Sequence, residues 1–130
     1  MKNNKGFTLI ELMGTLVVLA IVITLATTNV VGNMSRARKK TDRLAAKNYV
    51  TAVNDYNTMS TGDNRICGTN LDVTGVNTVI KDAVSGKLPS SGAITISCTT
   101  YKVTAASMRM SNYTIKFSTS GTNANKYIIQ

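Results

Sequence analysis

The sequence predicts an α+β fold in which a long N-terminal helix packs on a small antiparallel β-sheet. Helical spacing of apolar residues continues from about Phe7 to about Met59, and no proline occurs before Pro89. After about residue 93 the chain changes to alternating apolar and polar side chains, which is the period of a half-buried strand. Because both elements have one apolar face, we expect them to cover each other.

The first half of the predicted helix is apolar enough to span a membrane. From Phe7 to Val31 its only ionisable side chain is Glu11. A helix of that length would reach roughly 37 Å, and a bilayer core is about 30 Å thick. A secretory signal peptide fits less well, because its apolar region usually has about 7–15 residues and ends in a small-residue cleavage site. We therefore expect residues 7–33 to form a transmembrane helix.

Residues 34–130 are predicted to form a globular domain. Its helical half, 34–59, has polar and apolar faces, and Gly62 follows as a stop signal. A short helix is expected near 75–85, with Thr74 as N-cap and Gly86 at its end. Three or four antiparallel strands are expected over 93–130. The stripe that should face them consists of Met34, Ala37, Thr41, Leu44, Ala45, Ala52, Val53 and Tyr56.

The chain has two cysteines, Cys67 and Cys98. Neither lies in a CxxC motif, and the sequence has no histidine, so a zinc or redox site is disfavoured. We expect one disulfide, which would place this part of the chain in an oxidising, extracytoplasmic compartment. No metal or cofactor is expected. Since no pairing of nucleophile and base suggests itself, we also expect no enzymatic activity.

The N-terminal stretch "KGFTLIEL", followed by about twenty apolar residues, resembles the class III signal of type IV pilins and type II secretion pseudopilins. The resemblance implies a pilin-like α+β roll. It also implies a leader peptide over residues 1–6, cleavage by prepilin peptidase between Gly6 and Phe7, and methylation of the new Phe7 amine. The short leader and the phenylalanine are similar to those of the type IVa subclass.

The resemblance gives Glu11 a role in assembly. In the pilin family the matching glutamate is held to pair with the terminal amine of a neighbouring subunit. Two charges that would each be costly in an apolar setting are thereby neutralised. The alternative is a carboxylate that reaches the membrane interface or stays protonated.

The resemblance implies a structural subunit that waits in the cytoplasmic membrane and then joins a surface filament. Its expected partners are other subunits, the peptidase, the pilus assembly platform and, before assembly, the membrane.

No acidic residue follows Asp82, which disfavours the calcium site of secretion pseudopilins. The alternative function is a minor pilin, or a competence or secretion pseudopilin, whose globular domain binds DNA or a surface ligand. An uncleaved single-span anchor is a third hypothesis. The weak helix formers of Leu25–Gly32 suggest that the helix loosens there in a filament.

A basic run follows the apolar segment. Positive charge beside a membrane span normally marks the cytoplasmic side, but the prepilin signal and the expected disulfide favour the opposite orientation. We expect the run to solvate the helix face or pair with acidic residues; contact with DNA or an anionic surface polymer is the competing interpretation. The run consists of Arg36, Arg38, Lys39, Lys40, Arg43 and Lys47.

Overall fold

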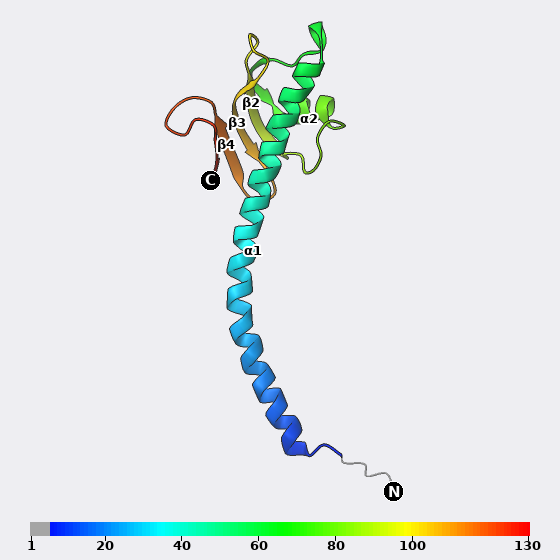
Figure 1. Ribbon diagram of the computed structural model, residues 1–130, viewed down its shortest axis with the longest axis vertical. Helices are drawn as coiled ribbons and strands as arrows, with labels where there is room; N and C mark the ends of the chain where they lie inside the picture. The colour runs from blue at the N-terminus through cyan, green and yellow to red at the C-terminus, as the bar shows by residue number, and fades with distance from the viewer. Residues whose placement is uncertain (1–5) are drawn as a thin grey trace. The chain divides into compact units, whose positions relative to one another are not determined.

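The computed structural model describes residues 6–130, apart from the side chains of Thr28 and Asn29. The chain divides between Ala37 and Arg38 into two compact units. Helix α1, Leu9–Met59, begins in the first unit and ends in the second. In the second unit it packs on a five-stranded antiparallel sheet, so the predicted α+β class is confirmed (Figure 1).

The apolar part of α1 is exposed throughout the first unit. Among the described residues, α1 is the one helix that contains an 18-residue window apolar enough to cross a membrane, and none of that window is buried. Threonines within it satisfy their hydroxyl groups locally. Thr15 donates to the Leu12 carbonyl at 2.8 Å, while Thr24 and Thr27 donate to carbonyls four residues back, at 2.8 and 2.7 Å. These bonds make the hydroxyls compatible with an apolar environment.

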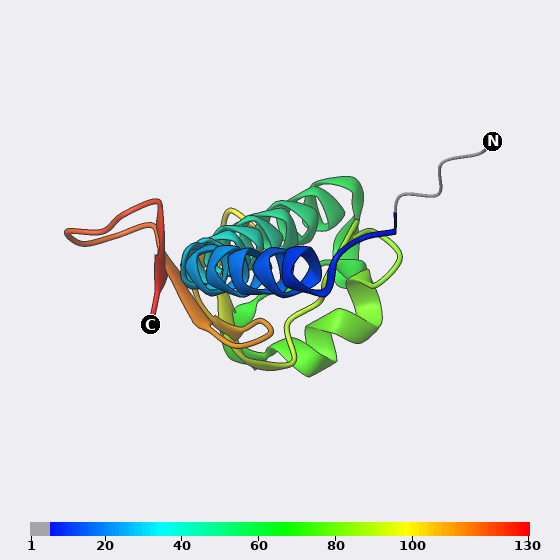
Figure 2. The same cartoon turned by 90° about the horizontal axis from the view of Figure 1, so that it is seen from below.

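The sheet has its strands in sequence order, β1-β2-β3-β4-β5. Each strand pairs antiparallel with the next. Helix α2, Val73–Ile80, flanks the β1 and β2 side, and the C-terminus lies at the opposite side (Figure 2). The strands are β1 Gly68–Asp72, β2 Ser91–Ile96, β3 Val103–Arg109, β4 Thr114–Ser118 and β5 Lys126–Ile129.

The core lies between α1, α2 and the inner face of the sheet. From α1 it takes Ala46, Tyr49, Val50 and Val53, which recur at intervals of three and four. Leu44, expected in this stripe, is instead 57% exposed. The inward face is therefore rotated relative to the predicted stripe. The remaining core residues are Val73, Val76, Ile80, Ile94, Ile96, Val103, Ala106, Met108, Met110 and Ile115.

Three local features differ from the sequence predictions. Helix α2 starts earlier, because Asp72 rather than Thr74 is the N-cap and accepts from the Thr74 amide at 3.3 Å. It ends at Ile80, before Gly86. Strand β1 had not been predicted, since "GTNLD" has little apolar alternation.

The third difference concerns β3. The apolar alternation in the sequence predicts Tyr101, Val103 and Ala105 on the inward face of this strand and a turn at "MRMSN". In the structure Thr95 pairs with Ala105 but Ile96 pairs with Val103, so β3 has an extra residue at this point. Such a bulge shifts the alternation. Val103 faces the core as predicted, but Ala106 and Met108 follow it there in place of Ala105.

Two asparagines fasten α1 to the segments around the sheet. Asn57, 1% exposed, donates to the carbonyls of Ile66 (2.8 Å) and Tyr101 (3.1 Å) and accepts from the Ile66 amide (2.8 Å). Asn54 accepts from the Val103 amide at 2.8 Å. The predicted disulfide joins Cys67 and Cys98, with Cα atoms 4.9 Å apart.

Candidate processing and assembly site

Gly6, Phe7 and Thr8 form an exposed non-helical segment immediately before α1. The Phe7 side chain is 85% exposed. A protease needs extended, accessible backbone around the bond that it cuts, and a helix hides that backbone. The predicted cleavage bond between Gly6 and Phe7 therefore lies in exposed, non-helical backbone, two residues ahead of the first helical turn.

Thr8 and Glu11 form a capping box at the start of α1. The Glu11 Oε2 atom accepts from the Thr8 amide at 3.3 Å and from the Thr8 hydroxyl at 3.1 Å. The Thr8 Oγ1 atom in turn accepts from the Glu11 amide at 3.4 Å. This reciprocal pattern needs threonine and glutamate three residues apart, which is the spacing in "TLIE". The carboxylate also lies at the positive end of the helix dipole.

The capping box explains how Glu11 can sit in an apolar helix of a single chain. Its charge is partly balanced by two hydrogen-bond donors of Thr8 and by the helix dipole. Both hydrogen bonds use Oε2, and no donor from the described residues reaches Oε1. The second oxygen is thus available to a cation from elsewhere. The T-x-x-E signature in the sequence is the local signal that could have indicated this cap.

A shallow groove runs from Glu11 along the same side of the helix. It passes over Gly14 and is lined by Thr15, Val18, Leu19 and Val22. A methyl group added at Gly14 would contact nothing within 4 Å. The missing side chain at Gly14 therefore opens space one turn after the carboxylate.

Comparison with protein families identifies this N-terminal region. The family model described as the prokaryotic N-terminal methylation motif matches residues 1–27. The chain carries a class III prepilin signal. This signal is found in type IV pilins and pseudopilins, and it supports a pilin-like or pseudopilin-like protein. No curated protein and no solved structure gives a significant match to the chain.

The prepilin signal and the apolar helix that follows it indicate membrane anchoring before assembly into surface filaments. The motif also implies processing by prepilin peptidase and assembly with other subunits. Within the motif, residues 1–5 lie outside the described part of the chain, whereas Gly6, Phe7 and Glu11 lie inside it.

The predicted basic residues lie along α1. Arg36 belongs to the first unit, and the other five belong to the second, where their side chains are exposed. Lys39 places its Nζ atom 5.4 Å from the centre of the Tyr113 ring, a cation–π contact with the turn between β3 and β4. The structure thus connects this run to a segment about seventy residues away, which no local sequence signal could indicate.

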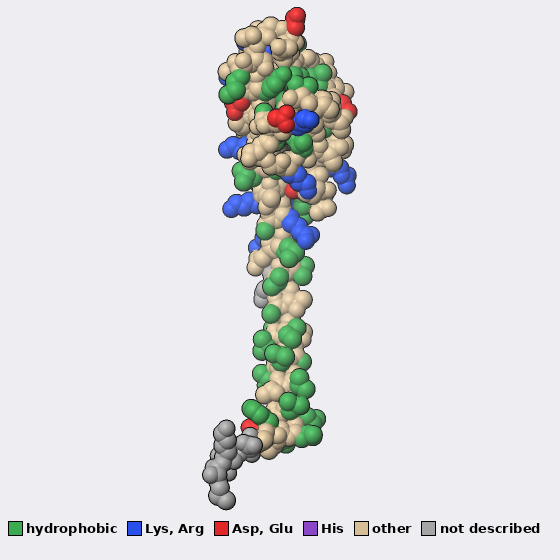
Figure 3. All heavy atoms as spheres, turned by 90° about the vertical axis from the view of Figure 1, so that its right-hand side faces the viewer, with side chains coloured by type: hydrophobic (Ala, Val, Ile, Leu, Met, Phe, Trp, Pro, Cys, Tyr) green, Lys and Arg blue, Asp and Glu red, His purple; other side chains and the backbone are tan. Residues whose placement is uncertain are grey.

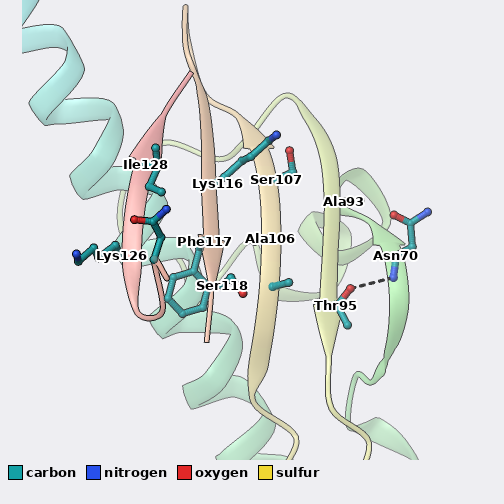
Figure 4. A pocket seen from close by; sticks show the side chains of 12 residues that line it. Asn70, Ala93, Thr95, Ala106, Ser107, Lys116, Phe117, Ser118, Lys126 and Ile128 are labelled. Carbon is teal, nitrogen blue, oxygen red and sulfur yellow. Dashed lines mark hydrogen bonds between the residues drawn. The ribbon is translucent and has the colours of Figure 1, made fainter. Parts of the chain in front are cut away.

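The outer face of the sheet has a second hollow, of about 310 Å³ (Figure 4). Small side chains such as Ala93, Ala105 and Ser107 form its floor, and Lys116 and Lys126 provide its charged groups. Its lining contains no carboxylate, imidazole or thiol that could act as a general base or metal ligand. Across the described residues, no group of three or more His, Cys, Asp or Glu is placed to hold a metal ion.

Proposed function

We propose that this chain is a pilin, a structural subunit of a type IV pilus-like filament. Prepilin peptidase would cut between Gly6 and Phe7 and methylate the Phe7 amine. The subunits would then polymerise through their N-terminal helices. The observation that carries this proposal is the combination of a prepilin signal with an apolar helix whose side chains are unburied.

The exposed apolar surface of α1 needs an apolar environment. The described residues include nineteen exposed large hydrophobic side chains, and fifteen of them come before Met34. Burying one such side chain contributes about 1.5–3 kcal/mol, so exposing fifteen of them to water would be strongly unfavourable. A bilayer before assembly, and a bundle of neighbouring helices afterwards, would both cover them.

Glu11 supports the proposal through its geometry. Cleavage would create an ammonium group at Phe7, next to the Thr8 amide that already donates to Glu11. The Oε1 atom of Glu11 would pair with the Phe7 amine of a neighbouring subunit. Neutralising both charges inside an apolar bundle favours one axial offset between helices, because other offsets leave two unpaired charges.

N-terminal mass spectrometry of filaments sheared from the cell surface tests the proposal. We expect a chain that starts at Phe7 and carries one extra methyl group on its amine. In cells that produce Gly6→Leu, the uncut chain should remain in the membrane and the filaments should be missing. A surface filament built of chains that start at Met1 would contradict the proposal, as would a processed chain absent from every filament.

The charge distribution of the globular unit favours one alternative. Residues 83–130 contain five basic residues and no acidic residue. Such a surface suits a minor pilin, or a competence or secretion pseudopilin, that binds DNA or another anionic surface ligand. Abundance separates the two functions, since a major pilin would dominate the sheared material and a minor subunit would form a small fraction of it.

A further inference from the structure

Lys and Arg side chains gather at one end of the globular unit (Figure 3). Contacts between three separate segments bring several basic residues together. One segment is residues 38–43 of α1, the second is residues 87–90 before β2, and the third is the end of β3 with the turn that follows it. We call their exposed basic residues the basal band. It consists of Arg38, Lys39, Lys40, Arg43, Lys87 and Arg109.

Four contacts hold these segments together. Lys39 lies over the Tyr113 ring, and the Ser111 hydroxyl donates to Asp42 Oδ1 at 3.1 Å. Lys87 donates to the same Ser111 hydroxyl. The Ser90 amide donates to the Arg109 carbonyl at 2.9 Å, which fixes the loop against the end of β3. The band is thus built by the tertiary structure, and only its helical part could be seen in the sequence.

Asp42 is joined to the band through Ser111, which Lys87 also contacts, and it is only 5% exposed. Its Oδ1 atom is bound to Ser111, and its Oδ2 atom has no hydrogen-bond partner in the described part of the chain. The Asp42 carboxylate cannot neutralise six exposed charges, so the band attracts anions from outside the chain.

The band lies close to the apolar segment along the chain. Arg38 follows Val31, the end of that segment, by seven residues. Seven residues of chain keep Arg38 near any membrane that the apolar segment spans. An anionic membrane surface attracts basic residues within about one Debye length, which is about 10 Å at 0.1 M salt.

We propose that the basal band binds the anionic headgroups of phospholipids while the subunit waits in the membrane; this rests on the membrane-anchored state of the proposed function. Phosphate headgroups need clustered positive charge and no base-specific geometry. Binding of single-stranded nucleic acid would need exposed aromatic faces, and Lys39 already covers the face of Tyr113 that it contacts. Leaving the membrane then requires breaking these contacts, so the band retains the subunit in the membrane until it is assembled.

Lysine labelling in vesicles tests the proposal on the full chain. The chain is inserted into vesicles of phosphatidylcholine alone, or of one part phosphatidylglycerol to two parts phosphatidylcholine, and labelling rates are read by mass spectrometry. A basic side chain near an anionic membrane gains about 1 kcal/mol, so labelling of Lys39, Lys40 and Lys87 should be about fivefold slower with phosphatidylglycerol. Lys116 and Lys126, on the outer sheet face, serve as internal controls and should not change.

A matched pair of variants tests whether the assembled band is needed. Lys87→Gln with Arg109→Gln should reduce the protection of Lys39 and Lys40, since these substitutions remove charge from the two segments outside α1. Lys116→Gln with Lys126→Gln removes the same charge elsewhere and should leave that protection intact. All four residues are exposed, so both variants should fold, which circular dichroism would verify.

Three outcomes would overturn the proposal. One is equal labelling in the two kinds of vesicle. Another is protection by duplex DNA added to phosphatidylcholine vesicles, without protection by phosphatidylglycerol, which would make nucleic acid the partner. The third is failure of the chain to float with either kind of vesicle at high salt, because the anchored state would then not exist. None of these measurements depends on filaments, so the proposal can fail while Phe7 is still found methylated in a pilus.

Discussion

Glu11 combines two tasks that require different properties of one side chain. As the last member of the capping box it needs an oxygen acceptor for the Thr8 donors, and as a partner of a terminal amine it needs a negative charge. Glutamine retains the acceptor and loses the charge. Substitution therefore separates the start of the helix from assembly.

For Glu11→Gln we expect normal cleavage at Phe7, unchanged helix content and a loss of most surface filament. The measurement is the ratio of sheared filament to the membrane pool. Thr8→Ala is the complementary variant, because it removes one cap but keeps the charge, and it should assemble far better than Glu11→Gln. Filament yields in the opposite order would show that capping rather than charge governs assembly.

Asn57, near the end of α1, makes three hydrogen bonds to the backbone of Ile66 and Tyr101, and Asn54 makes one to the amide of Val103. Removing a partner from a buried polar group costs about 1–3 kcal/mol. Asn57→Ala should accordingly lower the free energy of unfolding by about 3 kcal/mol, and Asn54→Ala by about 1 kcal/mol. Chemical denaturation of the globular unit would measure both. Equal losses would mean that the Asn57 contacts contribute less than their geometry indicates.

Tyr49 makes stability depend on alkaline pH. Burial raises the pKa of its phenol, and the negative charge of Asp72 raises it further. The unfolded chain ionises with a pKa of about 10, so above that pH the unfolded state loses a proton that the folded state keeps. Stability should therefore be unaffected by this group below pH 10 and fall as the pH rises above it. Tyr49→Phe should flatten this decline in thermal melts, and a decline of unchanged steepness would assign it to other groups.

At the scale of elements, the disulfide fixes a strand that has little core of its own. Cys67 precedes β1, and in that strand Leu71 is the residue packed against the core. The loop closed by the bond spans 31 residues of sequence separation. Closing a loop of that size stabilises a fold by about 4 kcal/mol in the chain-entropy model.

The double variant Cys67→Ser with Cys98→Ser should lose about this amount of stability, measured by denaturation against the oxidised protein. The rate of amide hydrogen exchange should increase most in β1 and at the C-terminal end of β2, because β1 pairs with no strand of the sheet other than β2. Uniformly faster exchange over all five strands would mean that the bond stabilises the whole unit rather than one edge.

The elements differ in how well the sequence predicts them, for physical reasons. The long helix was predictable because about fifty residues keep one period and no proline interrupts them. Strand β1 was missed because a strand at the edge of a sheet, with one inward residue, leaves no alternation. The shift in β3 was missed because a bulge is decided by pairing with β2. The prepilin signal was found because all its residues are contiguous, whereas the basal band joins segments that are distant in sequence.

At the scale of the whole molecule, the two units need different solvents. The exposed apolar side chains concentrate before Met34, while the core residues all lie after it. We expect a fragment of residues 34–130, secreted into an oxidising compartment, to be soluble and monomeric and to unfold in one cooperative transition. Size-exclusion chromatography and calorimetry would measure this. A fragment that aggregates would show that the apolar segment also protects part of the globular unit.

The threonines of the apolar helix affect how a filament would respond to force. The hydroxyl groups of Thr15, Thr24 and Thr27 donate hydrogen bonds to carbonyls of their own helix. In the proposed assembly the hydroxyl protons of these side chains are not available to neighbouring helices, so the contacts between helices there are mainly apolar and non-directional. Glu11, the one ionisable side chain from Phe7 to Val31, would then be the charged mark of register, so a stretched filament should lengthen by slipping its helices and recover its original length when that ion pair forms again.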